Sequence, residues 1–159
     1  GAGEEVEFSQ IVRPLVRMVE EGLLSDDRPV HFVVEGDAGE LRAEVATPLA
    51  VVLTELLQNA VQHAFPTDVT APAGTGAQPG IGEGRVIVSL HNDGTRLLVQ
   101  VRDNGVGLPP GFSIDALDGS SLGLMIVRTL VVSELRGSIA MTNDAGAVIE
   151  LRVPVDLIG

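Results

Sequence analysis

The chain has 159 residues, 45% of them hydrophobic and 20% charged, values typical of one soluble globular domain with a two-layer core. A net charge of −12 and the absence of Trp and Tyr argue against nucleic acid as a ligand, because phosphate backbones are bound by excess Lys and Arg, and unstacked bases by aromatic rings. The absence of Cys excludes disulfides, thiolate catalysis and thiolate metal sites. No apolar run reaches the roughly 18 residues of a membrane span. We therefore expect a single cytoplasmic domain over residues 1–159, without membrane contact.

The first part of the chain predicts a helix, a strand and a second helix. Residues 6–21 carry apolar side chains at helical spacing, namely Ile11, Leu15, Met18 and Val19. Residues 30–34 have the apolar, β-branched composition of a strand. Thr47 and Pro48 predict the start of the second helix, with Thr as N-cap and Pro at the first helical position. A proline after residue 65 predicts its end.

The second part predicts an insertion followed by two hairpins that flank a helix. Residues 66–84 are rich in Pro, Gly, Thr and Ala, which indicates a flexible surface insertion. Residues 85–91 and 96–102 read as strands joined by an Asn-Asp-Gly-Thr turn. After a loop, residues 122–135 predict a helix that ends with Gly137 in a left-handed conformation.

Two further strands, residues 138–142 and 147–153, form the second predicted hairpin around an Asp-Ala-Gly turn. No internal repeat is present. The order of the elements predicts a two-layer α/β sandwich, with helices packed on one face of a mixed, mostly antiparallel sheet.

The predicted helix before residue 65 carries a narrow polar stripe. One helical residue turns about 100°, so Glu55, Asn59, Gln62 and His63 fall within a sector about 100° wide, and most of the remaining circumference is apolar. Polar groups buried without partners are costly. The stripe is therefore either an exposed helix face or a ligand-binding surface.

Two glycine-containing segments follow, DNGVG at 103–107 and GSSLGL at 119–124. Asp103 stands at a strand end, where its carboxylate can accept a hydrogen bond. Gly105 and Gly107 allow positive φ and a close approach of the backbone, although a plain Asp-Asn-Gly turn has the same sequence. The second segment opens a helix, whose first N–H groups form a ready site for phosphate.

As an ordered set, ELLQNAVQHA at 55–64, DNGVG and GSSLGL resemble the N box and the two glycine-rich boxes of the GHKL ATPase superfamily, whose Bergerat fold binds ATP. The resemblance covers residues 6–154 and implies ATP and Mg²⁺ as cofactors. It implies that the Asn59 amide oxygen coordinates Mg²⁺, that Glu55 orients or deprotonates the attacking group, and that Asp103 accepts a hydrogen bond from the adenine amine. The remaining nucleotide contacts that it implies are Gln62, His63, Gly105, Gly107, Leu108, Gly119, Ser120, Ser121, Leu122, Gly123 and Leu124.

The chain departs from the family pattern at three positions. Gln62 stands where Lys or Arg is common, which argues against a cationic phosphate contact from this helix. Ser121 stands where a third Gly is usual, and its hydroxyl could donate to a phosphate or cap the helix. Ala147 stands where a Thr often supports the adenine-binding Asp, so we expect that contact to be absent.

Residues 108–121 resemble the ATP lid of the same family.

The SLGLMIV sequence from Ser121, followed by a helix and Arg-Gly137, looks most like sensor histidine kinases of the HWE-like group. This resemblance implies a catalytic domain that passes the γ-phosphoryl group to a His on an upstream dimerisation domain, and then to a response regulator receiver domain. His31 and His91 lie in predicted strands and His63 in the N box, so the acceptor is expected outside this chain.

Two other functions stay open. Anti-sigma-factor serine kinases also have an N box that ends in Asn-Ala-x-x-His-Ala and are complete at about this length, but usually lack the Ser-Leu-Gly-Leu pattern. A non-catalytic nucleotide sensor or interaction domain could also use this fold, although intact Glu55, Asn59 and Asp103 argue against it.

Overall fold

A computed structural model describes residues 5–23, 30–64, 84–108 and 122–155, without the side chains of residues 22, 23, 63 and 64. The predicted insertion, apart from Gly84, and the predicted lid, apart from Leu108, lie outside these ranges. In chain order the elements are β1 (Glu5–Glu7), α1 (Ser9–Leu23), β2 (Val30–Asp37), β3 (Glu40–Arg42), α2 (Ala43–Asn59), η1 (Ala60–Ala64), β4 (Gly84–Asn92), β5 (Arg96–Asp103), α3 (Leu122–Thr129), η3 (Leu130–Glu134), β6 (Ser138–Asn143) and β7 (Ala147–Pro154).

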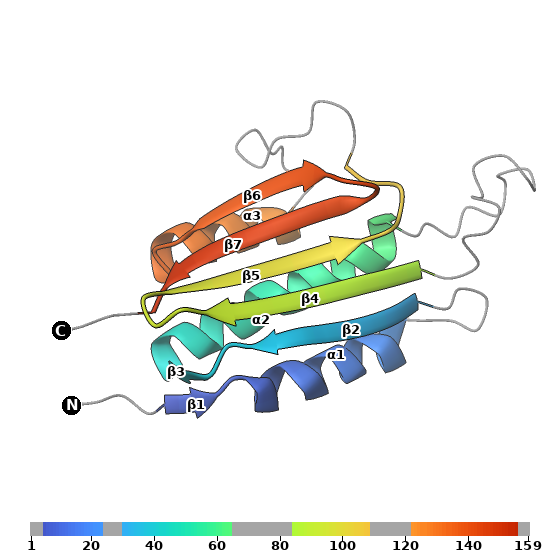
Figure 1. Cartoon of the computed structure of the whole chain (residues 1–159). Coiled ribbons are helices and arrows are strands. Elements are labelled where there is room, and N and C mark those ends of the chain that lie inside the picture. The colour runs from blue at the N-terminus through green and yellow to red at the C-terminus, as the bar shows by residue number, and fades with distance from the viewer. Residues whose placement is uncertain (1–4, 24–29, 65–83, 109–121, 156–159) are drawn as a thin grey trace, which may run out of the picture.

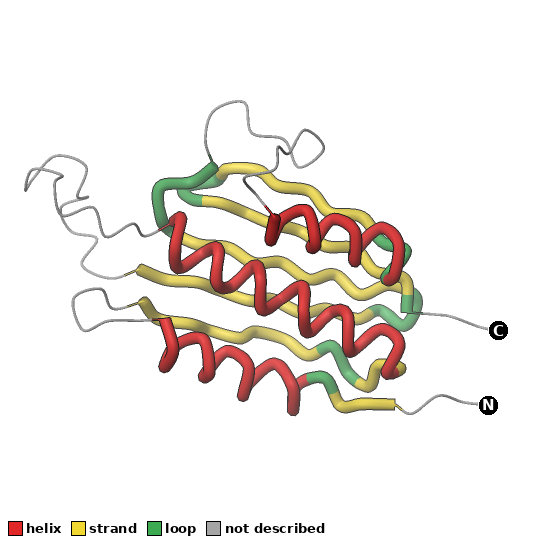
Figure 2. The backbone as a smooth tube through the Cα atoms, turned by 180° about the vertical axis from the view of Figure 1, so that it is seen from behind, coloured by secondary structure: helices red, strands yellow, loops and turns green. Residues whose placement is uncertain are grey.

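The main sheet has five strands in the order β2-β4-β5-β7-β6 (Figure 1). Strands β2 and β4 are parallel, and every other neighbouring pair is antiparallel. The helices α1, α2 and α3 lie side by side on one face of this sheet (Figure 2). A two-stranded ribbon of β1 and β3 lies beside it. This arrangement confirms the predicted mixed, mostly antiparallel sandwich and both predicted hairpins.

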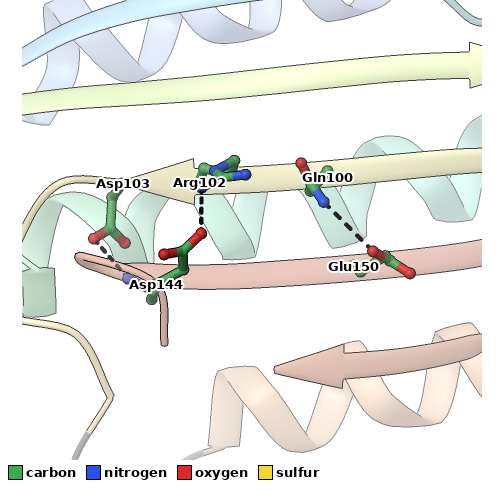
Figure 3. A network of polar contacts seen from close by, with 6 residues as sticks. Gln100, Arg102, Asp103, Asp144 and Glu150 are labelled. Carbon is green, nitrogen blue, oxygen red and sulfur yellow. Dashed lines mark hydrogen bonds and ion pairs between the residues drawn. The ribbon is translucent and has the colours of Figure 1, made fainter. Parts of the chain in front are cut away.

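The core lies between the sheet and the helices. Buried residues alternate with partly or fully exposed ones along β4 and β5, as expected for strands with one covered face. The largest fully buried side chains are Phe8, Leu49, Leu53, Leu56, Leu57, Leu97, Leu151, Val12, Val52, Val61, Val86 and Val88. The opposite face carries polar pairs, including Arg102 Nη2 with Asp144 Oδ2 at 2.9 Å and Gln100 Nε2 with Glu150 Oε2 at 3.4 Å (Figure 3).

The start of α2 differs from the prediction. The helix begins at Ala43, so Thr47 is not its N-cap and Pro48 lies inside it. The reason is packing, because Val45 and Ala46 are 4% and 1% exposed and extend the apolar face of the helix by one turn. Pro48 is tolerated because the carbonyl left without its N–H belongs to the exposed Glu44.

Three further expectations need correction. Residues 6 and 7 belong to β1, which pairs with β3, so α1 begins only at Ser9. Met18 is 59% exposed, whereas Val12 and Val16 join Leu15 and Val19 in the core. The left-handed residue after the last helix is Arg136, with φ 55°, and not Gly137. A Cβ at Gly137 would lie 2.2 Å from the Arg152 carbonyl oxygen, so close approach to β7 explains this glycine.

Candidate functional site

The first two sequence boxes and the described part of the third, residues 122–124, lie at one end of the sandwich. The C-terminal ends of α2 and β5 and the beginning of α3 lie at the same end of the sheet in both views (Figures 1 and 2). The helix α2 continues into the π-helical turn η1, where Ala60 and Val61 remain buried. Since π-helical turns widen a helix locally and concentrate at functional sites, this turn changes the direction of the polar stripe beyond Asn59.

Asp103 is held in place by two backbone N–H groups. Its Oδ1 accepts hydrogen bonds from Gly105 N at 2.9 Å and from Ala147 N at 3.1 Å. Ala147 has no side-chain hydroxyl, and its contact with the aspartate is made by the backbone N–H. Both bonds go to one oxygen, and among residues 5–23, 30–64, 84–108 and 122–155 no hydrogen bond to the other oxygen is found. The carboxylate is therefore fixed in orientation with Oδ2 available as an acceptor.

The environment of Asp103 changes its acidity. Partial burial raises the pKa of the Asp103 carboxyl above its ordinary value, because a charged group loses hydration there. The hydrogen bonds from the Gly105 and Ala147 N–H groups favour the charged form and oppose this rise. Burial thus disfavours the charged form of Asp103, and a further hydrogen-bond donor at this site would favour it.

Glu55 lies against the beginning of α3. A Cβ built on Gly123 would stand 2.7 Å from Glu55 Oε2, closer than real contacts allow. The glycine of the third box therefore leaves room for the carboxylate of the first box, as sequence alone could not show. The positive end of a helix dipole favours a negative charge at this place.

Asn59 carries a polar atom that lacks a protein partner. Within the described residues, its Nδ2 is the buried side-chain nitrogen or oxygen without a hydrogen bond. An unpaired buried polar atom costs free energy, and because Nδ2 is a hydrogen-bond donor, the partner that it lacks is an acceptor such as a water or ligand oxygen. Asn59 lies one helical turn after Glu55, so this unpaired amide and the carboxylate face the same side of α2.

The loop after Asp103 is held at both of its ends by asparagines. Asn104 accepts a bond from Arg85 N at 2.7 Å with Oδ1 and donates from its own N to the Arg85 carbonyl at 3.2 Å. Asn143, at the end of β6, holds Leu108. Gly107 has φ 81°, as predicted, but Gly105 does not have positive φ and instead serves as an N–H donor.

Several predicted contacts fall outside this geometry. Gly119, Ser120, Ser121 and the side chain of His63 lie outside the described residues. Gln62 is exposed, and Leu122 is 65% exposed, so neither is buried in the site. Sequence reasoning missed Asn104 and Asn143. The first stood inside a recognised motif but read only as a turn residue, and the second gave no signal, because its partner Leu108 is 35 residues away.

The donor set fits a cation held mainly by phosphates. Among the described residues there is no group of three or more His, Cys, Asp or Glu side chains that could hold a metal ion. Mg²⁺ prefers oxygen ligands and usually takes one or two from the protein, the rest from water and phosphate. The amide of Asn59 and the carboxylate of Glu55 match that chemistry.

In the same described ranges, no helix is long and apolar enough to cross a membrane.

The combination of a carboxylate fixed at a strand end, a polar helix and a glycine-opened helix defines an ATPase-type nucleotide-binding domain. Residues 44–157 match the family described as "Histidine kinase-, DNA gyrase B-, and HSP90-like ATPase". The chain belongs to this family. It is also similar to the sensor histidine kinase PdtaS of Mycobacterium tuberculosis, with 39% identity over 154 residues. That similarity covers 96% of this chain but only 28% of the length of PdtaS.

Solved structures share the fold. The histidine kinase domain of the Erythrobacter litoralis EL346 blue-light activated histidine kinase gives a TM-score of 0.72 at 22% identity, covering 98% of this chain and 66% of that one. The nucleotide-free catalytic domain of histidine kinase ThkA gives 0.71 at 20% identity, covering 96% and 95%. ThkA has also been solved in complex with the response regulator protein TrrA, with a TM-score of 0.67 at 22% identity, covering 96% and 41%.

Proposed function

We propose that this chain is the catalytic, ATP-binding domain of a sensor histidine kinase. The observation that carries the proposal is the contact of Glu55 with the start of α3 at Gly123, which joins the proposed base to the proposed phosphate site. The identity of 39% with PdtaS over nearly the whole chain supports the same function. The chain spans only 28% of the length of PdtaS, so we also propose, by similarity, the activity and partners of the full-length protein.

In this proposal each described group has one task. Asp103 Oδ2 accepts the hydrogen bond of the adenine amine, while Oδ1 stays bound to the backbone of Gly105 and Ala147. The Asn59 amide oxygen takes one coordination position of Mg²⁺, and Glu55 orients or deprotonates the acceptor that attacks the γ-phosphate. When bound, ATP would supply the phosphoryl group and Mg²⁺ would neutralise part of its charge. The residues of the protein would mainly position the reacting groups, as phosphoryl transfer requires.

The acceptor is expected on another domain. Leu122, Met125 and Ile126 are 65%, 41% and 40% exposed and belong to the same helix α3 as Gly123. Such neighbouring apolar side chains are suited to contact an acceptor helix. We therefore propose an upstream dimerisation domain with the phosphoacceptor His, and a response regulator receiver domain as second partner, as the complex of ThkA with TrrA suggests. Use of cellular ATP would place this domain in the cytoplasm.

The alternative functions are less well supported. The relatives found by sequence include sensor histidine kinases and the chemotaxis protein CheA of Halobacterium salinarum, at 27% identity. A serine kinase would transfer to a hydroxyl and a nucleotide sensor would transfer nothing. Both would still need Asp103, so the acceptor chemistry separates them from the histidine kinase.

The test uses γ-labelled ATP with the chain alone and with a longer protein that includes its upstream segment. His31 and His91 are held in the sheet, in β2 and β4, and His63 belongs to η1 of the proposed nucleotide site, so we expect no label on the chain alone. With the upstream segment we expect an acid-labile, base-stable label, as for phosphohistidine. Acid-labile label on the isolated chain would contradict the proposal that the acceptor His lies outside this chain. Acid-stable label on a protein added to the reaction would favour a serine kinase.

A further inference from the structure

Asn143 makes a two-point contact with the loop that follows Asp103. Its Oδ1 accepts a hydrogen bond from Leu108 N at 2.7 Å, and its Nδ2 donates to the Leu108 carbonyl at 3.3 Å. A Cβ built on Gly107 would lie 2.8 Å from Asn143 Oδ1, so the side chain also packs against that glycine. One amide therefore fixes both backbone polar groups of Leu108, as a neighbouring strand would.

The hairpin that carries Asn143 also holds the other end of the loop. Asn143 pairs with Ala147 at the β6–β7 turn, and Ala147 N donates to Asp103 Oδ1 at 3.1 Å. The next residue, Asp144, forms an ion pair with Arg102 at 2.9 Å (Figure 3). The β6–β7 hairpin thus contacts Arg102, Asp103 and Leu108. These contacts hold both the beginning and the end of the loop that follows Asp103.

Two features argue that this contact serves the site more than the fold. The Asn143 side chain is exposed, and the β6–β7 pairing is complete without it. The loop that it holds contains Gly105 and Gly107, and glycines lose the most conformational freedom when they are ordered. Ordering this loop in advance removes that entropic cost from ligand binding.

We propose that Asn143 is a positioning residue for the nucleotide. It holds Gly107 and Leu108 in the conformation in which the loop meets the ligand, and so keeps the loop and the Asp103 carboxylate in one fixed relation. The inference rests on the proposed function, because it concerns affinity for the same nucleotide. It adds a residue from outside the three sequence boxes to the site.

The test compares Asn143→Ala with a matched control, Asn92→Ala. Asn92 makes the same kind of two-point contact, with Nδ2 to the Ala38 carbonyl at 2.7 Å and Oδ1 from Gly94 N at 2.8 Å. It stands at the last residue of β4, opposite the β4 end that contacts Asn104. Calorimetry with Mg-ADP on the 159-residue chain should show about five- to ten-fold weaker binding for Asn143→Ala and unchanged binding for Asn92→Ala.

A second measurement follows the loop directly. Hydrogen exchange of the Leu108 amide, read by NMR without nucleotide, should accelerate in Asn143→Ala and stay unchanged in Asn92→Ala. Binding by Asn143→Ala within two-fold of the wild type would overturn the inference alone, and so would equal losses in both variants. If the wild-type chain itself fails to bind Mg-ADP, the proposed function fails and the inference falls with it.

Discussion

Gly123→Ala should separate stability from phosphoryl transfer. The added Cβ would stand 2.7 Å from Glu55 Oε2, whereas ordinary contacts begin at 3.4 Å, so the carboxylate must move by about 0.7 Å. Displacements of this size in a catalytic group cost on the order of 10–100-fold in rate. The obstacle is the end of a flexible side chain, and Ala is a better helix former than Gly by up to about 1 kcal/mol. We therefore expect unchanged or higher stability together with a large loss of transfer.

Three measurements test this reasoning. Thermal unfolding gives the stability, calorimetry gives the Mg-ADP affinity, and labelled ATP gives the transfer rate in the longer protein that carries the acceptor. Thr129→Ala, at an exposed position of the same helix, controls for changes in helix propensity. The decisive comparison adds Gly123→Ala to a Glu55→Ala background, where no carboxylate remains to be displaced. Full transfer by Gly123→Ala, or an equal further loss without the Glu55 carboxylate, would refute an action through Glu55.

Two further substitutions probe the same site. Asp103→Asn keeps an oxygen for the Gly105 and Ala147 N–H groups but presents an amide donor to the adenine amine, so Mg-ADP affinity should fall at least about ten-fold while the fold persists. Because burial raises the pKa of Asp103, the folded state loses stability when this carboxyl is charged. Asp103→Asn should therefore unfold at a higher temperature than the wild type at pH 7. This difference should shrink as the pH falls through the raised pKa and the wild-type carboxyl becomes protonated. An advantage that grows toward acid would show the opposite shift. Asn59→Ala removes an unpaired buried amide, so the free energy of unfolding should change by less than about 1 kcal/mol while the Mg²⁺ dependence of nucleotide binding is lost; undiminished Mg²⁺ dependence in calorimetry would exclude Asn59 as a ligand.

Features encoded within a few neighbouring residues could be predicted from the sequence. The hairpins around 92–95 and 144–146 follow from turn composition between apolar runs, since a tight turn needs only local backbone freedom. The positive φ of Gly107 belongs to this class. The three boxes also named Asn59 and Asp103, because each motif combines a chemical group with a local backbone conformation that suits it.

Features that depend on contacts between distant residues needed the tertiary structure. The helix α2 starts at Ala43 because Val45 and Ala46 have a core to face, and this outweighs the local Thr-Pro signal four residues later.

The same holds for the supports of the site. The Ala147 N–H reaches Asp103 because the β5–β7 register brings the two residues together. Asn143 reaches Leu108 across 35 residues for the same reason. The sequence by itself indicated which groups are proposed to carry the chemistry. Strand register and helix packing decided what holds those groups, because hydrogen bonds across a sheet leave no local pattern in the chain.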